Sequence, residues 1–310
     1  MRQADKTRWP CLLVCLLLAC LLTGLPGEPT PTFTLVFAGD VMLGRGVAQA
    51  LDGDWASAFA AVRPRLATAD CAFANLESPL TTAPQVSEGY DLRAPPAAVA
   101  ALQSAGFDVI SLANNHALDA GDAGLQETVS TLQIASITPL YQPTNYQFTN
   151  YQSTNYRLLA FDDSVTPLDI GAARDAVSAA ARESPVVVVS IHWGGEYQAA
   201  PGPRQRTLAR VLADAGADVI VGHGPHVLQR IEWVGNTLVA YSLGNFLFDQ
   251  PYPADCRQGA ILEVTLRGGR IFTVKILPTV VESGRTLPAG PQDAAAIYKR
   301  LCPTVNQPTN

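Results

Sequence analysis

The feature that most constrains the fold is a series of short apolar runs, rich in valine and isoleucine, which alternate with alanine-rich stretches of helical length. Such runs are typical of strands buried on both faces, and their alternation with helices predicts a layered α/β domain. We expect strands over residues 33–38, 71–74, 108–112, 158–161, 186–191, 218–221 and 237–242. Helices are expected over 96–104, 123–132, 168–181 and 204–215.

The C-terminal part of the chain carries a different pattern. Two further apolar runs, 260–266 and 271–276, are separated by a Gly-Gly pair, which predicts a β-hairpin. The tail over residues 283–310 is expected to contain a helix at 292–301 and a polar end.

A short repeat lies in the middle of the chain. Residues 144–156 contain Thr-Asn-Tyr three times, at intervals of five positions. The repeat is too short for a solenoid. A tandem duplication that forms a surface loop is therefore the favoured interpretation, and a functional aromatic patch is the alternative.

Residues 1–27 predict export from the cytoplasm. Basic residues precede an apolar run at 11–22, and a short linker follows at 28–32. The run is shorter than the roughly 20 residues that a membrane span needs, so a signal peptide is favoured. A lipobox ending at Cys20 and an uncleaved anchor are the alternatives. In each case the working domain, expected over 33–282, is extracytoplasmic, either secreted or tethered to the membrane.

The rest of the chain is acidic. The formal charge of −6 becomes −8 without residues 1–19, which hold three basic residues and one acidic residue. Only Lys275 and Lys299 then remain as lysines. We therefore expect no nucleic-acid partner, because such partners need a basic patch.

Three cysteines follow the predicted export segment. Cys71 lies inside an apolar run and is expected to be a buried thiol. Cys256 and Cys302 can pair in an oxidising compartment, and the sequence leaves that pairing open.

All four histidines of the chain lie where an expected strand ends, together with carboxylates and amides. Ligands gather at the carboxyl ends of strands in open α/β sheets, so these side chains are predicted to share one pocket. A single histidine beside an apolar run is usually a core residue, whereas the set together favours a site. Its members are Asp40, Asn75, Glu77, Asn114, Asn115, His116, His192, His223, His226 and Asn245.

The donor types in this set favour a metal site. Imidazole, carboxylate and amide donors without cysteine suit manganese, iron or zinc. The candidates outnumber the four ligands of one zinc ion, so two divalent metal ions are predicted. Two such ions about 3.5–4 Å apart can activate water and stabilise an oxyanion in phosphoester hydrolysis. Asp40 or Glu77 would bridge them, and a histidine that binds no metal is a candidate general acid.

The sequence contains six ordered segments: FAGDVMLGR, NLESPLT, SLANNHALDAGDAGL, HWGGEY, ADVIVGHGPHVLQ and YSLGNFLFDQ. Together they resemble the CapA family of capsule-synthesis proteins, which is associated with poly-gamma-glutamate biosynthesis and is similar to calcineurin-like metallophosphatases. The resemblance covers residues 33–250, is weaker to about residue 280, and implies a layered α/β/β/α sandwich of the metallophosphatase type.

The resemblance also implies roles for individual residues. It places catalytic roles on His192, His226, Asn115 and His116. It places metal ligands on Asp40, Asn75, Glu77, Asn115, His116, His192, His223 and His226. Two departures weaken one of the two ion sites: Met42 stands where the metallophosphatases have a histidine, and two residues separate His223 from His226 instead of one.

Three further residues are candidates for substrate binding. Arg93 can hold a carboxylate or phosphate with two hydrogen bonds, or it is a solvated loop arginine. Glu196 follows the His192 turn and can line the pocket beside Tyr197, whereas Trp193 is expected to pack. Asn245 either contacts substrate or, as we favour, holds a loop.

Two other classes of site are excluded by missing residues. The glycines after Asp40 lack the lysine and hydroxyl of a phosphate loop. The chain has no Gly-x-Ser-x-Gly elbow of a serine hydrolase.

The leading hypothesis is a metal-dependent hydrolase that acts on an anionic envelope polymer or a phosphoester substrate in capsule metabolism. The alternative is a non-catalytic envelope protein that binds the polymer or assists a membrane synthase, with a structural or vestigial metal site. A phosphodiesterase unrelated to capsule is a third possibility.

Overall fold

The computed structural model describes residues 31–141, 144–149 and 155–302. The predicted signal segment, 1–27, and Cys20 lie outside these residues. The side chains of 144–149 and 155 are likewise not described. All helices and strands below belong to the unit that begins at Thr32.

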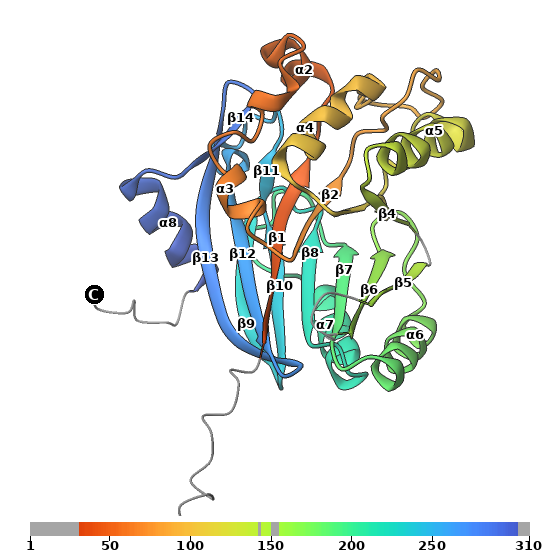
Figure 1. Ribbon diagram of the computed structural model, residues 1–310, viewed down its shortest axis with the longest axis vertical. Helices are drawn as coiled ribbons and strands as arrows, with labels where there is room; N and C mark the ends of the chain where they lie inside the picture. The colour runs from red at the N-terminus through yellow and green to blue at the C-terminus, as the bar shows by residue number, and fades with distance from the viewer. Residues whose placement is uncertain (1–30, 142–143, 150–154, 303–310) are drawn as a thin grey trace, which may run out of the picture. The chain divides into compact units, whose positions relative to one another are not determined.

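The first of two sheets contains β1 at its centre (Figure 1). Strands β1 to β4 are parallel, β12 to β14 are antiparallel, and β11 pairs with the carboxyl end of β1. In spatial order the strands are β14 (Arg285–Pro288), β13 (Arg270–Glu282), β12 (Gln258–Arg267), β1 (Thr32–Val41), β2 (Cys71–Leu76), β3 (Val109–Ser111) and β4 (Thr138–Leu140), with β11 (Asn245–Leu247) beside β1.

The second sheet packs face to face against the first. Strands β6, β7, β8 and β10 are parallel, and β5 and β9 are antiparallel edge strands. Its order is β5 (Thr144–Thr149), β6 (Asn155–Asp162), β7 (Val187–His192), β8 (Val219–His223), β10 (Thr237–Leu243) and β9 (Leu228–Val234).

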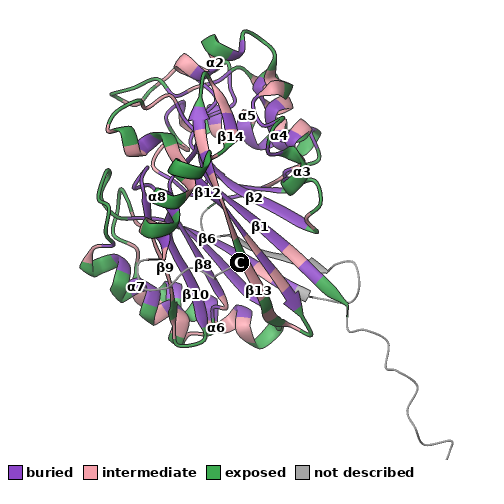
Figure 2. Cartoon of the chain, turned by 90° about the vertical axis from the view of Figure 1, so that its left-hand side faces the viewer, coloured by how far each residue is buried: buried purple, intermediate pink, exposed green. Residues whose placement is uncertain are grey.

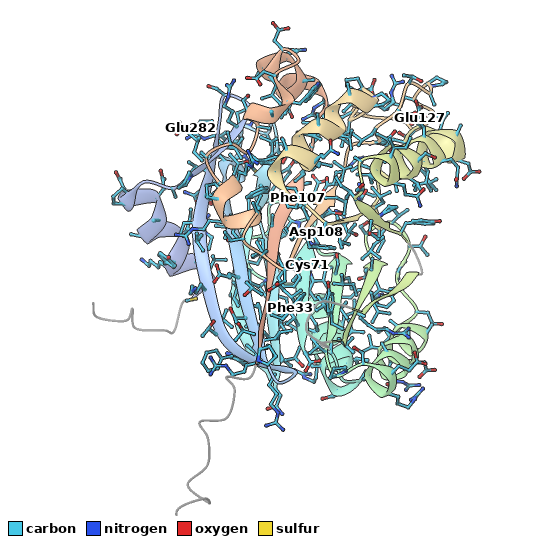
Figure 3. All side chains as sticks on the ribbon, in the orientation of Figure 1. Phe33, Cys71, Phe107, Asp108, Glu127 and Glu282 are labelled. Atoms are coloured by element: carbon cyan, nitrogen blue, oxygen red, sulfur yellow. The ribbon has the colours of Figure 1, made fainter. Side chains whose placement is uncertain are left out.

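Strand β1 shows how an apolar run contributes to the cores on both faces of a sheet. Leu35 and Phe37 face the core between the sheets, whereas Val36 and Ala38 face the core beneath the helices. Successive side chains of a strand point to opposite faces, so a strand covered on both sides needs apolar residues throughout. Phe33 and Cys71, labelled in Figure 3, belong to the core between the sheets.

Helices cover the outer face of each sheet, so the fold is an α/β/β/α sandwich, as predicted. Figure 2 shows buried strands between helices whose outward sides are exposed. The first sheet is covered by α2 (Arg45–Leu51), α3 (Arg63–Leu66), α4 (Val99–Ala105) and α5 (Gly121–Ile134). The second is covered by α6 (Ile170–Glu183) and α7 (Pro203–Asp214).

The C-terminal segment is part of the sandwich. The predicted Gly-Gly hairpin is present between β12 and β13. The predicted tail begins with β14, which extends the first sheet, and continues into the predicted helix, α8 (Pro291–Leu301). Ile297 and Leu301 of α8 are buried in the core between the sheets, so this segment closes that core.

The structure differs from the predictions at the repeat segment. Within the loop predicted over 144–156, residues 144–149 form β5 and pair with β6, which begins at Asn155, and residues 150–154 lie outside the described residues. The β5 sequence, Thr-Asn-Tyr-Gln-Phe-Thr, lacks the valine- and isoleucine-rich run on which the strand predictions relied. Cys71 is buried as expected, and Cys256 and Cys302 are both free thiols in the structure. Across the described residues, no helix combines the length and apolar character needed to cross a membrane.

Candidate metal centre

The site lies where the carboxyl ends of parallel strands from the two sheets meet. Asp40 is near the end of β1, and His223 ends β8 of the opposite sheet. The Asp40 carboxylate accepts hydrogen bonds from the Gly224 N–H at 3.1 Å and from His223, whose Nδ1 is 3.0 Å away. The two sheets are therefore joined directly at Asp40.

Glycine permits a close backbone approach behind Asp40. The Asp40 N–H donates to the Gly244 carbonyl at 2.9 Å. A β-carbon at Gly39 would lie 2.0 Å from the same oxygen, so only glycine fits there. This contact brings β11 and Asn245 beside the site.

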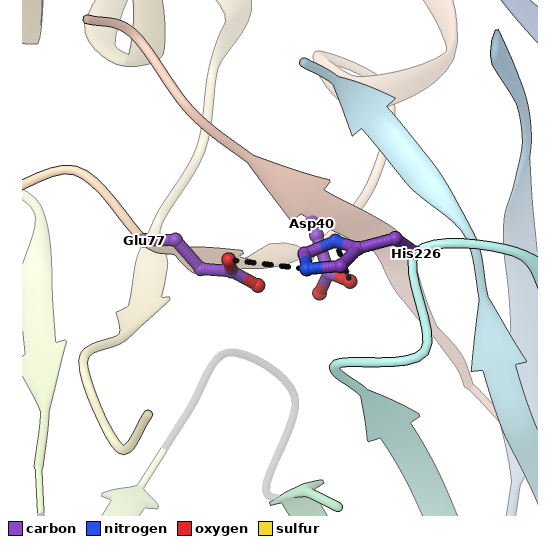
Figure 4. A group of neighbouring side chains, drawn as sticks. All are labelled: Asp40, Glu77 and His226. Atoms are coloured by element: carbon purple, nitrogen blue, oxygen red, sulfur yellow. Dashed lines mark ion pairs between the residues drawn. The ribbon is translucent and has the colours of Figure 1, made fainter. Parts of the chain in front are cut away.

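Three buried side chains form the centre of the site: Asp40, Glu77 and His226 (Figure 4). One ligand atom from each lies within 4.8 Å of the other two. His226 Nδ1 is 3.6 Å from Asp40 Oδ2, and its Nε2 is 3.8 Å from Glu77 Oε2. Two oxygen donors and one nitrogen donor at this spacing suit a divalent cation.

Two more histidines border this centre from the second sheet. His192, the last residue of β7, places Nε2 3.3 Å from Glu77 Oε1. His223 contacts the other carboxylate, Asp40. The φ angle of Gly224 is +102°, and a β-carbon there would lie 2.9 Å from the His192 ring, so glycine makes room for this histidine.

Asn75 holds the two carboxylates from the first sheet. Its Nδ2 donates to Asp40 Oδ1 at 3.0 Å and to Glu77 Oε1 at 3.2 Å. Its Oδ1 accepts from Asn114 Nδ2 at 3.0 Å. The amide oxygen, which a metal would need, therefore faces Asn114, and this geometry favours an orienting role for Asn75 over the predicted role of ligand.

Asn245 fixes the tautomer of His226. Asn245 Nδ2 donates to Gln250 Oε1 and to the Cys256 carbonyl, both at 3.0 Å, so its Oδ1 is the acceptor toward His226 Nδ1, also at 3.0 Å. His226 Nδ1 thus carries a hydrogen, and Nε2 lies toward Glu77. Asn245 is fully buried with both amide atoms engaged. This geometry favours the preferred interpretation, that Asn245 holds a loop, over substrate contact, and it also orients His226.

His116 and Asn115 form the side of the site next to β3. His116 Nδ1 lies 2.8 Å from Asp119 Oδ2, and His116 Nε2 lies 3.0 Å from Asn115 Nδ2. The His116 side chain is 22% exposed, whereas Asp119 is nearly buried. His116 is thus the site histidine with the most access to solvent.

The pKa shifts follow from this arrangement. Burial raises the pKa of Asp40, but the His223 hydrogen bond and the charges of three site histidines outweigh it and lower the pKa to about 2. Burial lowers the pKa of His192, yet the hydrogen bond and charge of Glu77 raise it overall. The pKa of His116 is also raised, because Asp119 outweighs burial. The carboxylates therefore draw positive charge into the site.

Several buried atoms of the site have no hydrogen-bond partner among the residues that the structure describes. They are Glu77 Oε2, Asn115 Oδ1, His192 Nδ1 and His223 Nε2. Such atoms are costly unless water or an ion satisfies them. Among the described residues, the ion-pair partners of Asp40 and Glu77 are histidines and not lysine or arginine. The site therefore fits bound metal, since buried carboxylates are paired or coordinate metals.

The remaining predicted residues lie at the edge of the site or away from it. All three guanidinium nitrogens of Arg93 are engaged, by Asp91 and by the Ala83 carbonyl, so this arginine stabilises its own loop. Glu196 is exposed on the turn after His192. Met42 is buried, and its sulfur accepts from the Gly44 N–H. Trp193 packs in the core, as expected, and donates to the Tyr241 carbonyl.

Two acidic residues of the site were not predicted. Asp119 lies three residues after His116, and Asp162 faces His192 Nδ1 at 3.8 Å. Asp162 is the last residue of β6, so examining the polar residue at the end of this strand, as for the others, would have found it. Asp119 is signalled only by its short separation from His116.

The fold is of the metallophosphatase type. The chain superposes on a novel phosphatase from Mycoplasma pneumoniae with a TM-score of 0.54, which covers 87% of this chain and 98% of that one. The two sequences are 12% identical, so the likeness concerns the fold alone.

Sequence comparison then identifies the family. The family described as "Bacterial capsule synthesis protein PGA_cap" matches residues 34–140 and 141–250, and the chain belongs to it. It is 32% identical over 283 residues to the "PGA biosynthesis protein CapA" of Bacillus subtilis (strain 168), covering 81% of this chain and 72% of that protein. It is 30% identical over 301 residues to the "Capsule biosynthesis protein CapA" of Bacillus anthracis, covering 86% and 72%.

Proposed function

We propose that this protein is a metal-dependent hydrolase of the phosphoester type that acts outside the cytoplasm in synthesis of a polyglutamate capsule. The observation that carries the hydrolase proposal is the convergence of donors from both sheets on one buried point where polar atoms lack partners. The relatives named for capsule and PGA biosynthesis support the capsule role. The apolar run at 11–22 supports export, by secretion or tethering.

Specific residues would hold two divalent ions, manganese, iron or zinc. Asp40, Glu77 and His226 would bind at the centre, and His192, His223 and Asn115 would supply further donors. Such ions supply Lewis-acid activation of water and stabilise developing negative charge. Asn75 and Asn245 would hold the ligands in position through the hydrogen bonds described above.

His116 is the candidate that would hold and transfer a proton. Asp119 receives the Nδ1 hydrogen, so Nε2 of the neutral ring accepts from Asn115 Nδ2 and must itself be protonated before it can act as an acid. A histidine held in this way, with partial access to solvent, can donate a proton to a leaving group. His192 and His226 are both buried and face Glu77, so they are better placed as ligands.

The test combines metal content with turnover. Protein reconstituted with manganese is analysed for bound metal and for hydrolysis of bis(p-nitrophenyl) phosphate. We expect Asp40→Asn and His192→Ala to lose metal and at least about a hundredfold of activity, more than changes around a metal shell cost. Arg270→Gln, at the tip of the β12–β13 hairpin, should retain both. Full activity in either site variant would contradict the proposal.

A non-catalytic role in polymer binding or synthase assistance is the second candidate. Met42 favours it, because a buried thioether occupies the position where metallophosphatases have a histidine. The same measurements separate the two functions. Tight binding of polyglutamate or of a membrane synthase, without turnover in metal-loaded protein, would support this second role.

A further inference from the structure

Arg45 lies beside the site in an unusual backbone conformation. It follows Asp40 by five positions and begins α2. Its φ angle is +45°, in the left-handed region that residues other than glycine seldom adopt. Such conformations persist where the surroundings hold them and often mark functional positions.

Asp249 fixes the direction of the Arg45 side chain. Its carboxylate accepts from Arg45 Nε at 3.1 Å and also from Nη2. The same carboxylate accepts from the Gly46 N–H at 2.9 Å. A β-carbon at Gly46 would lie 3.0 Å from Asp249 Oδ2, so glycine permits this approach.

Two aromatic rings flank the Arg45 guanidinium. Its central carbon lies 5.2 Å from the centre of the exposed Tyr90 ring and 5.9 Å from that of Phe248. Phe248 in turn packs edge-on against His226, with ring centres 5.0 Å apart. Arg45 is thereby held one ring away from a residue of the candidate metal centre.

The guanidinium keeps donors for a ligand. Nη1 of Arg45 has no hydrogen-bond partner among the described residues, and a quarter of the side chain is exposed. Arg93 differs, because all three of its nitrogens are engaged within its own loop. Phe248 and Asp249, which contact Arg45, also line a cavity of about 370 Å³ that reaches Arg257.

We propose that Arg45 binds an anionic group of the substrate next to the reacting group, either a carboxylate or a phosphate oxygen. Arginine suits both, since its planar fork offers two parallel donors to an oxyanion. Asp249 takes one edge of the fork, and Nη1 with the remaining Nη2 hydrogen forms the other. The inference rests on the proposed function and makes Arg45 a specificity determinant for a polyanionic substrate.

The experiment measures binding to manganese-loaded protein by calorimetry. The two probes are a γ-linked glutamate oligomer, which offers carboxylates, and inorganic phosphate. Arg45→Gly removes the side chain and suits the left-handed backbone, whereas Arg45→Lys keeps the charge but loses the fork. Arg270→Gln is the matched control. Arg270 is exposed and pairs with Arg267, which in turn pairs with Thr32 at the start of β1. Asp40 lies near the other end of β1.

We expect Arg45→Gly to bind one probe about tenfold more weakly or worse, with unchanged manganese content. The probe affected identifies the carboxylate or the phosphate. Arg45→Lys should fall between Arg45→Gly and wild type, and Arg270→Gln should match wild type.

Two results would overturn the inference. One is equal binding of both probes by wild type and Arg45→Gly, and the other is no binding of either probe by metal-loaded wild type. Neither depends on turnover of bis(p-nitrophenyl) phosphate. Arg45-dependent binding without turnover would support the inference and contradict the hydrolase, and turnover with Arg45-independent binding would do the reverse.

Discussion

The two sheets of the sandwich contribute different chemistry to the site. The first sheet supplies oxygen: the carboxylates of Asp40 and Glu77, joined by the Asn75 amide. The second supplies nitrogen, from His192 and His223 at adjacent strand ends. The first-sheet residues are hydrogen-bonded to one another, whereas these histidines bond across to the first sheet.

The difference has an electrostatic reason. Two buried carboxylates close together repel each other, so they need a shared donor such as Asn75 to stay in place without metal. Imidazoles carry no negative charge, so the carboxylates do not repel them and they can approach from the opposite sheet. The first sheet therefore holds the two carboxylates in position through Asn75, and the second sheet adds the histidines.

The largest effects are expected from removing a single metal-binding atom, either a carboxylate oxygen or a histidine nitrogen. Glu77→Gln and His226→Ala should both lose bound manganese and reduce hydrolysis by more than about a hundredfold, because each removes an atom from the same centre. Metal analysis and turnover check this. Retention of full metal content in one variant would show that the two sides do not share a centre.

The next largest effect is expected at Gly224, which leaves room for the His192 ring. Gly224→Ala should destabilise folding by about 1–3 kcal/mol and displace His192, because φ is +102° and the new β-carbon would lie 2.9 Å from the ring. Gly235→Ala is the control, since it has a positive φ but no neighbour within 4 Å. Denaturant unfolding and manganese affinity compare the two. Equal manganese affinity in both variants would contradict the steric argument.

A smaller effect is expected from the residue that orients His226. Asn245→Ala removes the acceptor of the His226 Nδ1 hydrogen and should weaken manganese binding by about 10–100-fold. Exposed Asn236→Ala, in the β9–β10 turn, should leave affinity unchanged. Calorimetric titration measures both. Wild-type affinity in Asn245→Ala would remove Asn245 from the positioning role.

The smallest effect on the site is expected from the core between the sheets. Ile297→Ala in α8 should cost about 2–5 kcal/mol of folding free energy, since the side chain is fully buried. Manganese affinity of the folded protein should not change, because Ile297 belongs to the apolar core between the sheets and is not one of the residues of the candidate metal centre. A parallel loss of affinity would show that the site depends on how tightly the sheets pack.

The sequence predicted the buried strands better than the edges. Central strands such as β1 and β8 have apolar residues on both faces and so produce a clear signal. Strand β5 and the partly exposed β9 lie at the sheet edges and were missed. Edge strands form through backbone pairing, which side-chain patterns record only weakly.

For the site as well, the sequence predicted some features and not those that depend on contacts between distant segments. Reading the polar residue at each strand end located Asp40, Glu77 and His192, because parallel strands place their carboxyl ends together. It did not predict which way the Asn75 amide turns, since that depends on Asn114 from the neighbouring strand. Arg45 was also missed, because its position depends on Asp249, about two hundred residues away in the chain.

The most direct test is an anomalous diffraction map from crystals of the manganese-loaded protein. We predict density bounded by Asp40, Glu77 and His226, as two peaks about 3.5–4 Å apart, with His192 and His223 as ligands from the second sheet. This prediction would be contradicted by manganese elsewhere on the protein while these side chains stay hydrogen-bonded to one another around an empty centre.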